Sequence, residues 1–232
     1  MNTLHLLCAG AAQGLVKALQ ERFRIDSGAE LQRRFGAVGA MQELLRAAEP
    51  CDVMVVTAAM VDTLVADGLL RGDTRAPLGR VRTGIAVRSG EARPDVSSPE
   101  ALKAALLGAD AIYFPDPERA TAGIHFANVM RQLGIHETLQ ARFRTYPSGA
   151  ISMRELAATD APRLIGCTQV TEINYTEGVQ LVAPLPQRFE LATTYTAAVG
   201  ARAAQPELAA RFIALLTGPA SLALRAAGAF ES

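Results

Sequence analysis

The sequence predicts an α/β fold in which a mainly parallel sheet is flanked by helices. Short apolar segments alternate with amphipathic segments of helical period along the chain, as expected for repeated strand–loop–helix units. One of them, Asp52–Thr57, carries the continuous apolar run of a strand that is buried on both faces. With 232 residues, 50% of them hydrophobic, the chain can form one large domain or two small lobes.

The N-terminal segment shows the unit from which the sheet is built. A strand is expected over Leu4–Ala9, and a helix follows Gly10–Gln13 and continues to about Ser27. Four apolar residues share one face of that helix: Leu15, Val16, Leu19 and Phe23. Gly28 is expected to end it, because glycine adopts the left-handed conformation of helix C-termini without steric cost.

The rest of the chain continues this alternation. Further strands are expected at Glu30–Phe35, Asp52–Thr57, Arg80–Arg88, Ala111–Phe114, Leu164–Thr168, Val179–Val182 and Leu191–Val199. Further helices are expected after residues 36–39, over Ala58–Leu70, behind Ser98, over Thr121–Leu133 and near residues 136–143, 149–158, 206–216 and 219–227. The helix behind Ser98 has a clear start, since serine caps it and Pro99 occupies its first position. Successive strand–loop–helix units favour parallel pairing with right-handed crossovers.

The charges of the chain argue against nucleic acid or a membrane surface as a partner. Its 23 Lys and Arg residues balance its 23 Asp and Glu residues, so no overall field attracts a polyanion. No apolar run approaches the ~20 residues of a membrane span, so no membrane insertion is expected. A small anion remains a compatible partner, because a pocket can be positive inside a neutral protein.

The three cysteines predict neither a metal site nor a reactive thiol. Cys8, Cys51 and Cys167 are too far apart for a metal-binding motif, and their number is odd. Cys8 and Cys167 lie in or beside expected core strands, where a free thiol packs as a small hydrophobe. We therefore expect three unpaired thiols, no metal and no cofactor.

Four loops that follow expected strands are candidates for holding a ligand. In an open α/β sheet, ligands bind beyond the carboxyl ends of strands, where helix N-termini present unpaired N–H groups. The four loops are Gly10–Gln13, Gly36–Gly39, Arg119–Gly123 and Thr168–Glu172. Small residues dominate the first three, which allows a ligand to approach the backbone closely. Each loop alone could be an ordinary strand–helix turn, so their joint occurrence carries more weight.

A series of different short motifs also extends over almost the whole chain. In order they are Leu6–Ala11, Gly39–Met41, Cys51–Val55, Asp62–Gly68, Thr83–Arg88, Pro94–Ser97, Gly123–Phe126, Leu133–Ile135, Thr171–Ile173, Val182–Pro186 and Ala227–Gly228. Each is loose by itself. Their order and spacing resemble the type II periplasmic binding proteins, in particular the branch that contains the molybdate-binding proteins and their extracellular solute-binding relatives.

This resemblance implies a two-lobed type II periplasmic-binding-protein fold with the ligand in a cleft between the lobes. The chain would cross from one lobe to the other near Arg82 and return near Glu190. Lobe I would then comprise residues 1–82 and 191–232, and lobe II residues 83–190. Each lobe would be a mainly parallel sheet flanked by helices, and the implied partner is a small-molecule anion.

The chain departs from the molybdate pattern at two loops. Molybdate-binding proteins hold the oxyanion there with serine hydroxyls, whereas Ala11, Ala12 and Val38 carry none. A tetrahedral oxyanion would lose several hydrogen bonds of about 1 kcal/mol each, so a di- or tricarboxylate is expected instead. The residues expected to bind it are Gly10, Ala11, Ala12, Gln13, Val38, Gly39, Thr57, Arg80, Arg82, Thr121, Gln169 and Thr171.

Four side chains admit both a functional and a structural interpretation. His125 lies about one turn into the helix near Thr121 and could face the ligand or simply pack. Glu172 lies at a helix start, where a carboxylate can merely complement the helix dipole. Arg80 and Arg82 share one face of their strand, and could clamp a carboxylate or form a surface pair.

Two functional hypotheses follow. In the first, which we prefer, the chain is a solute-binding protein for a small organic anion. In the second, it is an isomerase of an unsaturated polycarboxylate such as aconitate, a reaction that some members of the wider fold family perform. His125 or Glu172 would then transfer the proton, and Arg80 or Arg82 would hold the anion. No motif requires catalysis, which is why binding is preferred.

The N-terminus bears on where the protein acts. Met1, Asn2 and Thr3 lead directly into the first expected strand, without the basic and apolar regions of a secretory signal. As written, the chain is expected in the cytoplasm; if Met1 replaces a removed signal peptide, it is expected in the periplasm. Only in the second case would a transporter permease be its partner.

Overall fold

The computed structural model describes residues 2–231 and forms two compact units of α/β architecture. Unit 1 comprises Met1–Val81 and Thr193–Ser232, and unit 2 comprises Arg82–Ala192. Arg82 and residues 191–192, which were expected in lobe I, belong to unit 2. Met1 and Ser232 lie outside the described residues. The predicted alternation of strands and helices is confirmed.

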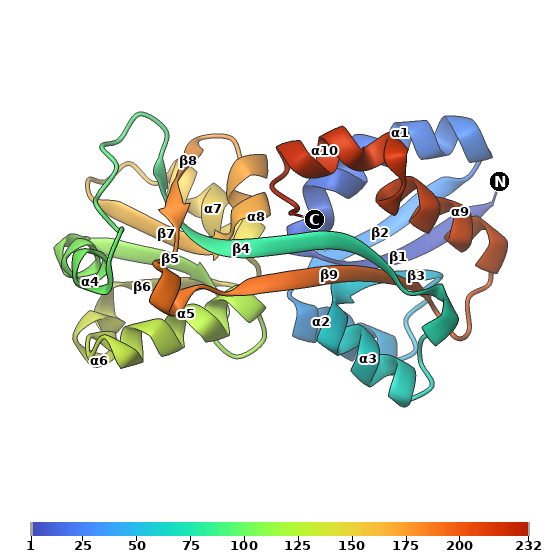
Figure 1. Cartoon of the computed structure of the whole chain (residues 1–232), viewed down its shortest axis with the longest axis horizontal. Coiled ribbons are helices and arrows are strands. Elements are labelled where there is room, and N and C mark those ends of the chain that lie inside the picture. The colour runs from blue at the N-terminus through green and yellow to red at the C-terminus, as the bar shows by residue number, and fades with distance from the viewer. Residues whose placement is uncertain (1, 232) are drawn as a thin grey trace. The chain divides into compact units, whose positions relative to one another are not determined.

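Unit 1 is a sheet between two layers of helices. Its strands are β1 (Thr3–Ala9), β2 (Glu30–Gly36), β3 (Val53–Thr57) and β9 (Ala192–Val199), hydrogen-bonded in the order β2-β1-β3-β9. Its α-helices are α1 (Gln13–Ser27), α2 (Val38–Arg46), α3 (Ala58–Ala66), α9 (Pro206–Thr217) and α10 (Leu222–Ala227). β1 pairs in parallel with β2 and β3, while β9 runs antiparallel to β3. Figure 1 shows α1 and α9 on one side of the strands and α2 and α3 on the other.

The predicted N-terminal strand–helix unit is confirmed in detail. A single 3-10 turn, Gly10–Ala12, joins β1 to α1. The four residues expected on one face of α1, together with Gln13, are its buried positions. Gly28 ends the helix with φ 67°, the left-handed conformation for which glycine suffers no Cβ clash.

Unit 2 has the same layered construction. Its strands are β5 (Ala111–Pro115), β6 (Phe143–Tyr146), β7 (Leu164–Gln169), β8 (Val179–Pro184) and the second half of β4 (Ala76–Arg88). β5 pairs in parallel with β6 and β7, and β4 runs antiparallel to β7 and β8. Its α-helices are α4 (Pro99–Gly108), α5 (Thr121–Gln132), α6 (His136–Leu139), α7 (Gly149–Ala158) and α8 (Val170–Tyr175).

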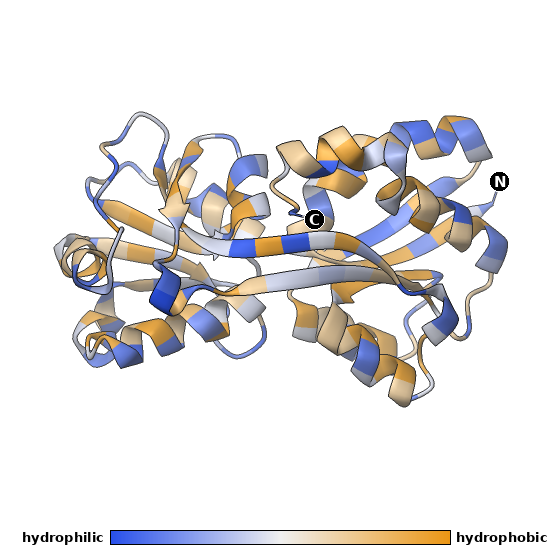
Figure 2. Ribbon diagram, in the orientation of Figure 1, coloured by the Kyte–Doolittle hydropathy of each residue, from blue (hydrophilic) through white to orange (hydrophobic). Residues whose placement is uncertain are grey.

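Each unit has its own hydrophobic core. In unit 1 the strands pack against α1, α2 and α9 in one cluster. In unit 2 the two faces of the sheet carry separate clusters: one packs against α4 and α5, the other against α7 and α8. Figure 2 shows hydrophilic and hydrophobic residues alternating along β4, and the mixed colouring of the helices that cover the strands. This arrangement fixes the ends of the strands, and therefore the loops that follow them.

Several elements differ from the sequence-based expectation, and three of them bear on the sheet or on the helix after β3. β6 was not predicted, because this four-residue strand is only partly buried and has no apolar run. α3 ends at Ala66 rather than Leu70, since Gly68 takes φ 69° and the following backbone turns back onto Leu64. β4 begins at Ala76, four residues before the predicted start.

Within residues 2–231, no single helix is long and apolar enough to cross a membrane. The segments Pro206–Thr217 and Pro219–Ala227 meet the length and composition criteria only as a pair, which is bent by 49°. Most apolar residues of α9 pack in the core of unit 1, where Phe212 and Leu216 are fully buried.

Candidate functional site

The carboxyl edge of the sheet in unit 2 collects several loops that sequence analysis considered separately. β5, β6 and β7 are parallel, so the starts of α5, α7 and α8 all lie at one edge. Gln169, the last residue of β7, pairs with Thr83 of the antiparallel β4. Thr121, Gln169, Thr171 and Glu172, four of the predicted residues, are therefore brought to the same edge.

The side chain of Glu172 is closely packed at this edge of the sheet. Its side chain is almost fully buried, with an exposed fraction of 5%. The Thr168 hydroxyl donates to its Oε2 at 2.5 Å, and the Ala150 backbone N–H of α7 donates to its Oε1 at 3.2 Å. Gly149 permits this approach: a Cβ there would lie 1.9 Å from the Thr168 Oγ1 and 2.1 Å from the Glu172 Oε2.

Burial governs the protonation of Glu172. Desolvation raises the pKa of its carboxyl above the ordinary value, while the hydrogen bonds from Thr168, Ala150 and Gln169 oppose that rise. A carboxyl group with a raised pKa can hold or release a proton closer to neutral pH than an exposed glutamate. The sequence favoured Glu172 as a complement to the dipole of its own helix. The structure has it in the first turn of α8, as expected, and its carboxyl also accepts a hydrogen bond from the start of α7.

Three buried polar side chains at the same edge have no hydrogen-bond partner among residues 2–231. They are Thr83, Gln169 and Thr171, whose exposed fractions are 1%, 2% and 5%. Both the Nε2 and the Oε1 of Gln169 are unpaired, as are the hydroxyls of Thr83 and Thr171. Native proteins pair nearly all buried polar atoms, so this group needs a partner from outside the chain, either a solute or water.

Helix starts fall into two groups. α3, α4 and α7 are capped by the side chains of Thr57, Ser98 and Ser148. No side chain caps α1, α2, α5 or α8, the helices that begin at the four predicted ligand loops. α6, α9 and α10 also lack a side-chain cap, so uncapped starts are not confined to the four predicted loops. α9 opens with a proline and carries Glu207 in its first turn. Uncapped N–H groups are the feature by which helix starts bind anions.

The carboxyl edge of unit 1 is apolar by comparison. The ends of β1 and β2 pair side by side, which brings Gly10–Gln13 close to Val38 and Gly39. Ala11, Ala12 and Val38, which were expected to bind the ligand, are buried, and Gln13 is a buried polar side chain among them. Thr57 was predicted to bind the ligand; its hydroxyl accepts a hydrogen bond from the Met60 N–H at 3.3 Å and so caps α3.

The predicted arginines and histidine are engaged in contacts within the chain. Arg80 lies 3.6 Å from Glu231, and Arg82 lies 3.9 Å from Glu190. His125 Nε2 lies 2.7 Å from the backbone carbonyl oxygen of Phe189, to which it donates when protonated. This contact ties α5 to the turn before β9, a structural role that the sequence left open.

Two parts of the carboxyl edge of unit 2 were not predicted from the sequence. The start of α7, with Ser148, Gly149 and Ala150, was not considered because the strand before it was not recognised. Thr83 was missed because its pairing with Gln169 depends on the register of two strands far apart in the chain. Pro147 and the small-residue pair Ser148-Gly149 were the local indications of a turn there.

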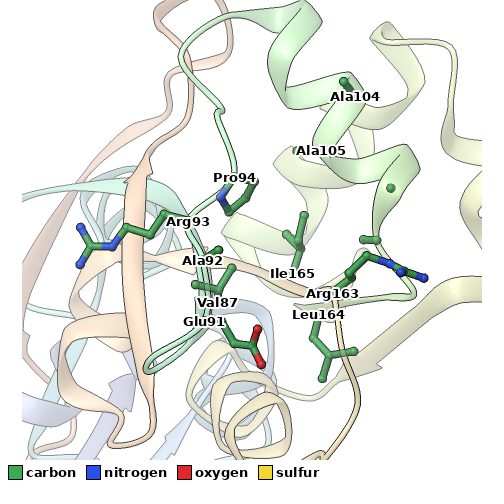
Figure 3. A pocket seen from close by; sticks show the side chains of 12 residues that line it. Val87, Glu91, Ala92, Arg93, Pro94, Ala104, Ala105, Arg163, Leu164 and Ile165 are labelled. Carbon is green, nitrogen blue, oxygen red and sulfur yellow. The ribbon is translucent and has the colours of Figure 1, made fainter.

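Unit 2 also contains an apolar pocket of about 310 Å³ at the opposite end of β7. Its lining combines Val87 and the loop after β4 with α4 and the first residues of β7, Leu164 and Ile165. Figure 3 shows the guanidinium groups of Arg93 and Arg163 on opposite sides of the apolar side chains. Arg163 pairs with Asp110 at 2.6 Å, and Arg93 donates to Gln180 at 3.3 Å, so neither charge is without a partner. The carboxyl edge therefore suits a polar solute better.

The cysteines and acidic side chains do not assemble a metal centre. In the described part of the chain, no three His, Cys, Asp or Glu residues converge as metal ligands would. Cys8, Cys51 and Cys167 are free thiols. Burial raises the pKa of Cys51 to about 12 and also raises those of Cys8 and Cys167, so the three thiols are poor nucleophiles.

Comparison with known proteins agrees with this architecture. A family model described as bacterial extracellular solute-binding protein matches residues 4–228. Aconitate isomerase of Pseudomonas sp. is 25% identical over 220 residues, which cover 90% of this chain and 80% of that protein. The periplasmic molybdate-binding protein of Azotobacter vinelandii superposes with a TM-score of 0.78 at 18% identity, over 99% of both chains. The sulfate-binding protein of Mycobacterium tuberculosis gives a TM-score of 0.75 at 15% identity, over 99% of this chain and 86% of that one.

Proposed function

We propose that this chain, which belongs to the bacterial extracellular solute-binding protein family, binds a small organic anion, a di- or tricarboxylate. Its fold is the two-lobed fold of type II periplasmic binding proteins. The observation that carries this proposal is the group of unpaired, buried polar atoms on Thr83, Gln169 and Thr171. They lie at the sheet edge where the uncapped α5 also begins. The combination provides donors for carboxylate oxygens and side chains for orientation.

An organic anion is favoured over a tetrahedral oxyanion. Two of the similar structures are described as molybdate- and sulfate-binding proteins. In this chain the first two loops of unit 1 offer Ala11, Ala12 and Val38, whose buried side chains cannot donate a hydrogen bond. A fully desolvated oxyanion that loses two or three donors loses about 1 kcal/mol or more for each. A longer organic acid can reach donors at other positions.

Catalysis is a second candidate, favoured by two observations. The relative from Pseudomonas is an aconitate isomerase, and Glu172 is a buried carboxyl with a raised pKa at the candidate site. In an allylic isomerisation, a base removes a proton from a methylene carbon and the double bond shifts. The same group then returns that proton to the other end of the allylic system. Glu172 is our candidate for this group, since His125 already contacts the Phe189 carbonyl.

A thermal-shift panel tests the binding proposal. Citrate, tricarballylate, malate, succinate, molybdate and sulfate should be compared at several concentrations. A carboxylate present at 100 times its dissociation constant should stabilise the protein by about 2.7 kcal/mol, with little effect of molybdate or sulfate. The largest stabilisation by molybdate, or none by any carboxylate, would contradict the proposal.

Deuterium incorporation tests the catalytic candidate. The protein should be incubated with cis- and trans-aconitate in deuterated water and the products followed by proton NMR. An isomerase interconverts the isomers or exchanges a carbon-bound proton, and Glu172→Gln should lower turnover more than affinity. If neither conversion nor exchange occurs although the acids bind, the chain is a binding protein only.

A further inference from the structure

The unpaired polar atoms in unit 2 restrict the chemistry of the solute further. Thr83 and Gln169 are directly opposite each other on antiparallel β4 and β7, so their side chains share one face of the sheet. They do not hydrogen-bond to each other. Thr171 follows two residues after Gln169, in the first turn of α8, and its hydroxyl is also unpaired.

Gln169 is the informative member of this group. Its amide has an Nε2 that can only donate and an Oε1 that can only accept, and both are buried without a partner. An unpaired buried polar atom is costly, so a well-matched ligand must offer both an acceptor and a donor. A carboxylate or an inorganic oxyanion offers acceptors only and would leave the Gln169 Oε1 unpaired.

We infer that the solute carries a hydroxyl group beside its carboxylates, and that Gln169 with Thr83 recognises this hydroxyl. A hydroxyl donates one hydrogen bond and accepts others, which matches the donor and acceptor left open on Gln169. Thr83, Gln169 and Thr171 are all uncharged, so they favour a neutral hydroxyl over an ammonium group. This inference rests on the proposed function, and it makes Gln169 a specificity-determining residue.

The inference distinguishes this chain's solute from close analogues. Citrate and tricarballylate each have three carboxylates and differ by one hydroxyl. Malate and succinate each have two carboxylates and also differ by one hydroxyl. Sites that hydrogen-bond a ligand hydroxyl reject the analogue that lacks it, because their own buried polar groups then stay unpaired. The hydroxy acid of each pair should therefore bind more tightly.

Isothermal titration of the full-length protein with these matched pairs is the test. We expect the hydroxy acid to bind at least about 10-fold more tightly than its analogue in one of the pairs. Gln169→Met keeps the size of the side chain but removes both polar atoms, and should reduce this preference to less than about 3-fold. Thr83→Val should weaken the preference independently. The control Gln132→Met, at an exposed position near the end of α5, should retain the preference of the parent.

The possible outcomes separate this inference from the proposed function. The inference is wrong if the acid and its hydroxy analogue bind equally well, or if Gln169→Met retains the preference for the hydroxy acid. In that case water fills the space beside the unpaired polar atoms, and the chain still binds carboxylates. If no carboxylate binds at all, the proposed function fails and the inference fails with it. Thermal melts of each variant will show that a changed preference does not come from unfolding.

Discussion

Asp52 in unit 1 and Glu172 in unit 2 are both buried carboxyl side chains, with exposed fractions of 1% and 5%. Asp52 accepts hydrogen bonds from the backbone N–H groups of His5 and Gln205 at 2.8 and 2.9 Å, and its Oδ2 lies 3.3 Å from the His5 Nδ1. It thereby ties together three distant segments: β1, the start of β3 and the residue before α9. Glu172 accepts hydrogen bonds from the Thr168 hydroxyl at 2.5 Å and from the Ala150 backbone N–H at 3.2 Å, and also from the backbone of Gln169.

The difference lies in the surroundings of the two carboxyl groups. At Asp52 each oxygen has at least one donor and each donor belongs to the scaffold. Around Glu172, the neighbouring Gln169 and Thr171 keep unpaired polar atoms. A protein stabilises its scaffold by satisfying buried polar groups, and leaves them unsatisfied where a ligand will complete them.

Removing the scaffold carboxylate should have the largest effect. Asp52→Ala leaves the N–H groups of His5 and Gln205 buried without acceptors, so we expect a loss of about 3 kcal/mol in the free energy of unfolding. Asp52→Asn retains one acceptor oxygen and should cost less. Urea denaturation of both variants measures this. Equal stability of Asp52→Ala and the parent would show that the contacts of Asp52 contribute nothing.

Filling the space beside Glu172 should have the next largest effect. Gly149→Ala places a methyl group within 2.1 Å of the Glu172 Oε2, so the carboxyl must move away from α7. We expect a loss of about 2 kcal/mol in stability and weaker carboxylate binding. Gly108→Ala is the matched control, since a Cβ there meets nothing within 4 Å, and it should stabilise α4 slightly. Thermal melts and titrations of the two variants will show whether the close approach matters.

The smallest effect concerns the pH dependence of stability. Because the pKa of Glu172 is raised in the folded state, its contribution is fully present below the ordinary value of 4.5 and is lost as the pH rises through the folded-state pKa. Glu172→Gln cannot lose a proton. The stability of this variant relative to the parent should therefore increase with pH across that window, measured by urea denaturation at a series of pH values. A difference that is constant with pH would mean that Glu172 is not held neutral by burial.

The sequence predicted the scaffold better than the site. Apolar runs such as that of β3 and the cap Ser98 are local features, and local features determined the strands and helices. β6 escaped because Arg144 and Thr145 are exposed and give the segment no apolar pattern. Thr83 and the start of α7 join the site through strand pairing between distant segments, which no local pattern reveals. The contact of His125 with the Phe189 carbonyl likewise joins distant segments. The cap that Thr57 provides to α3 is local, like that of Ser98.

Hydrogen–deuterium exchange with and without citrate tests the central claim most directly, because it compares the two ends of the sheet in unit 2 within one experiment. The account predicts that citrate slows exchange at the starts of α5, α7 and α8, residues 121–123, 148–150 and 169–172. Residues 91–94, 104–105 and 108–109, which line the apolar pocket, should be unchanged. Protection confined to the apolar pocket, or no protection at the carboxyl edge under saturating citrate, would contradict the assignment of that edge as the binding site.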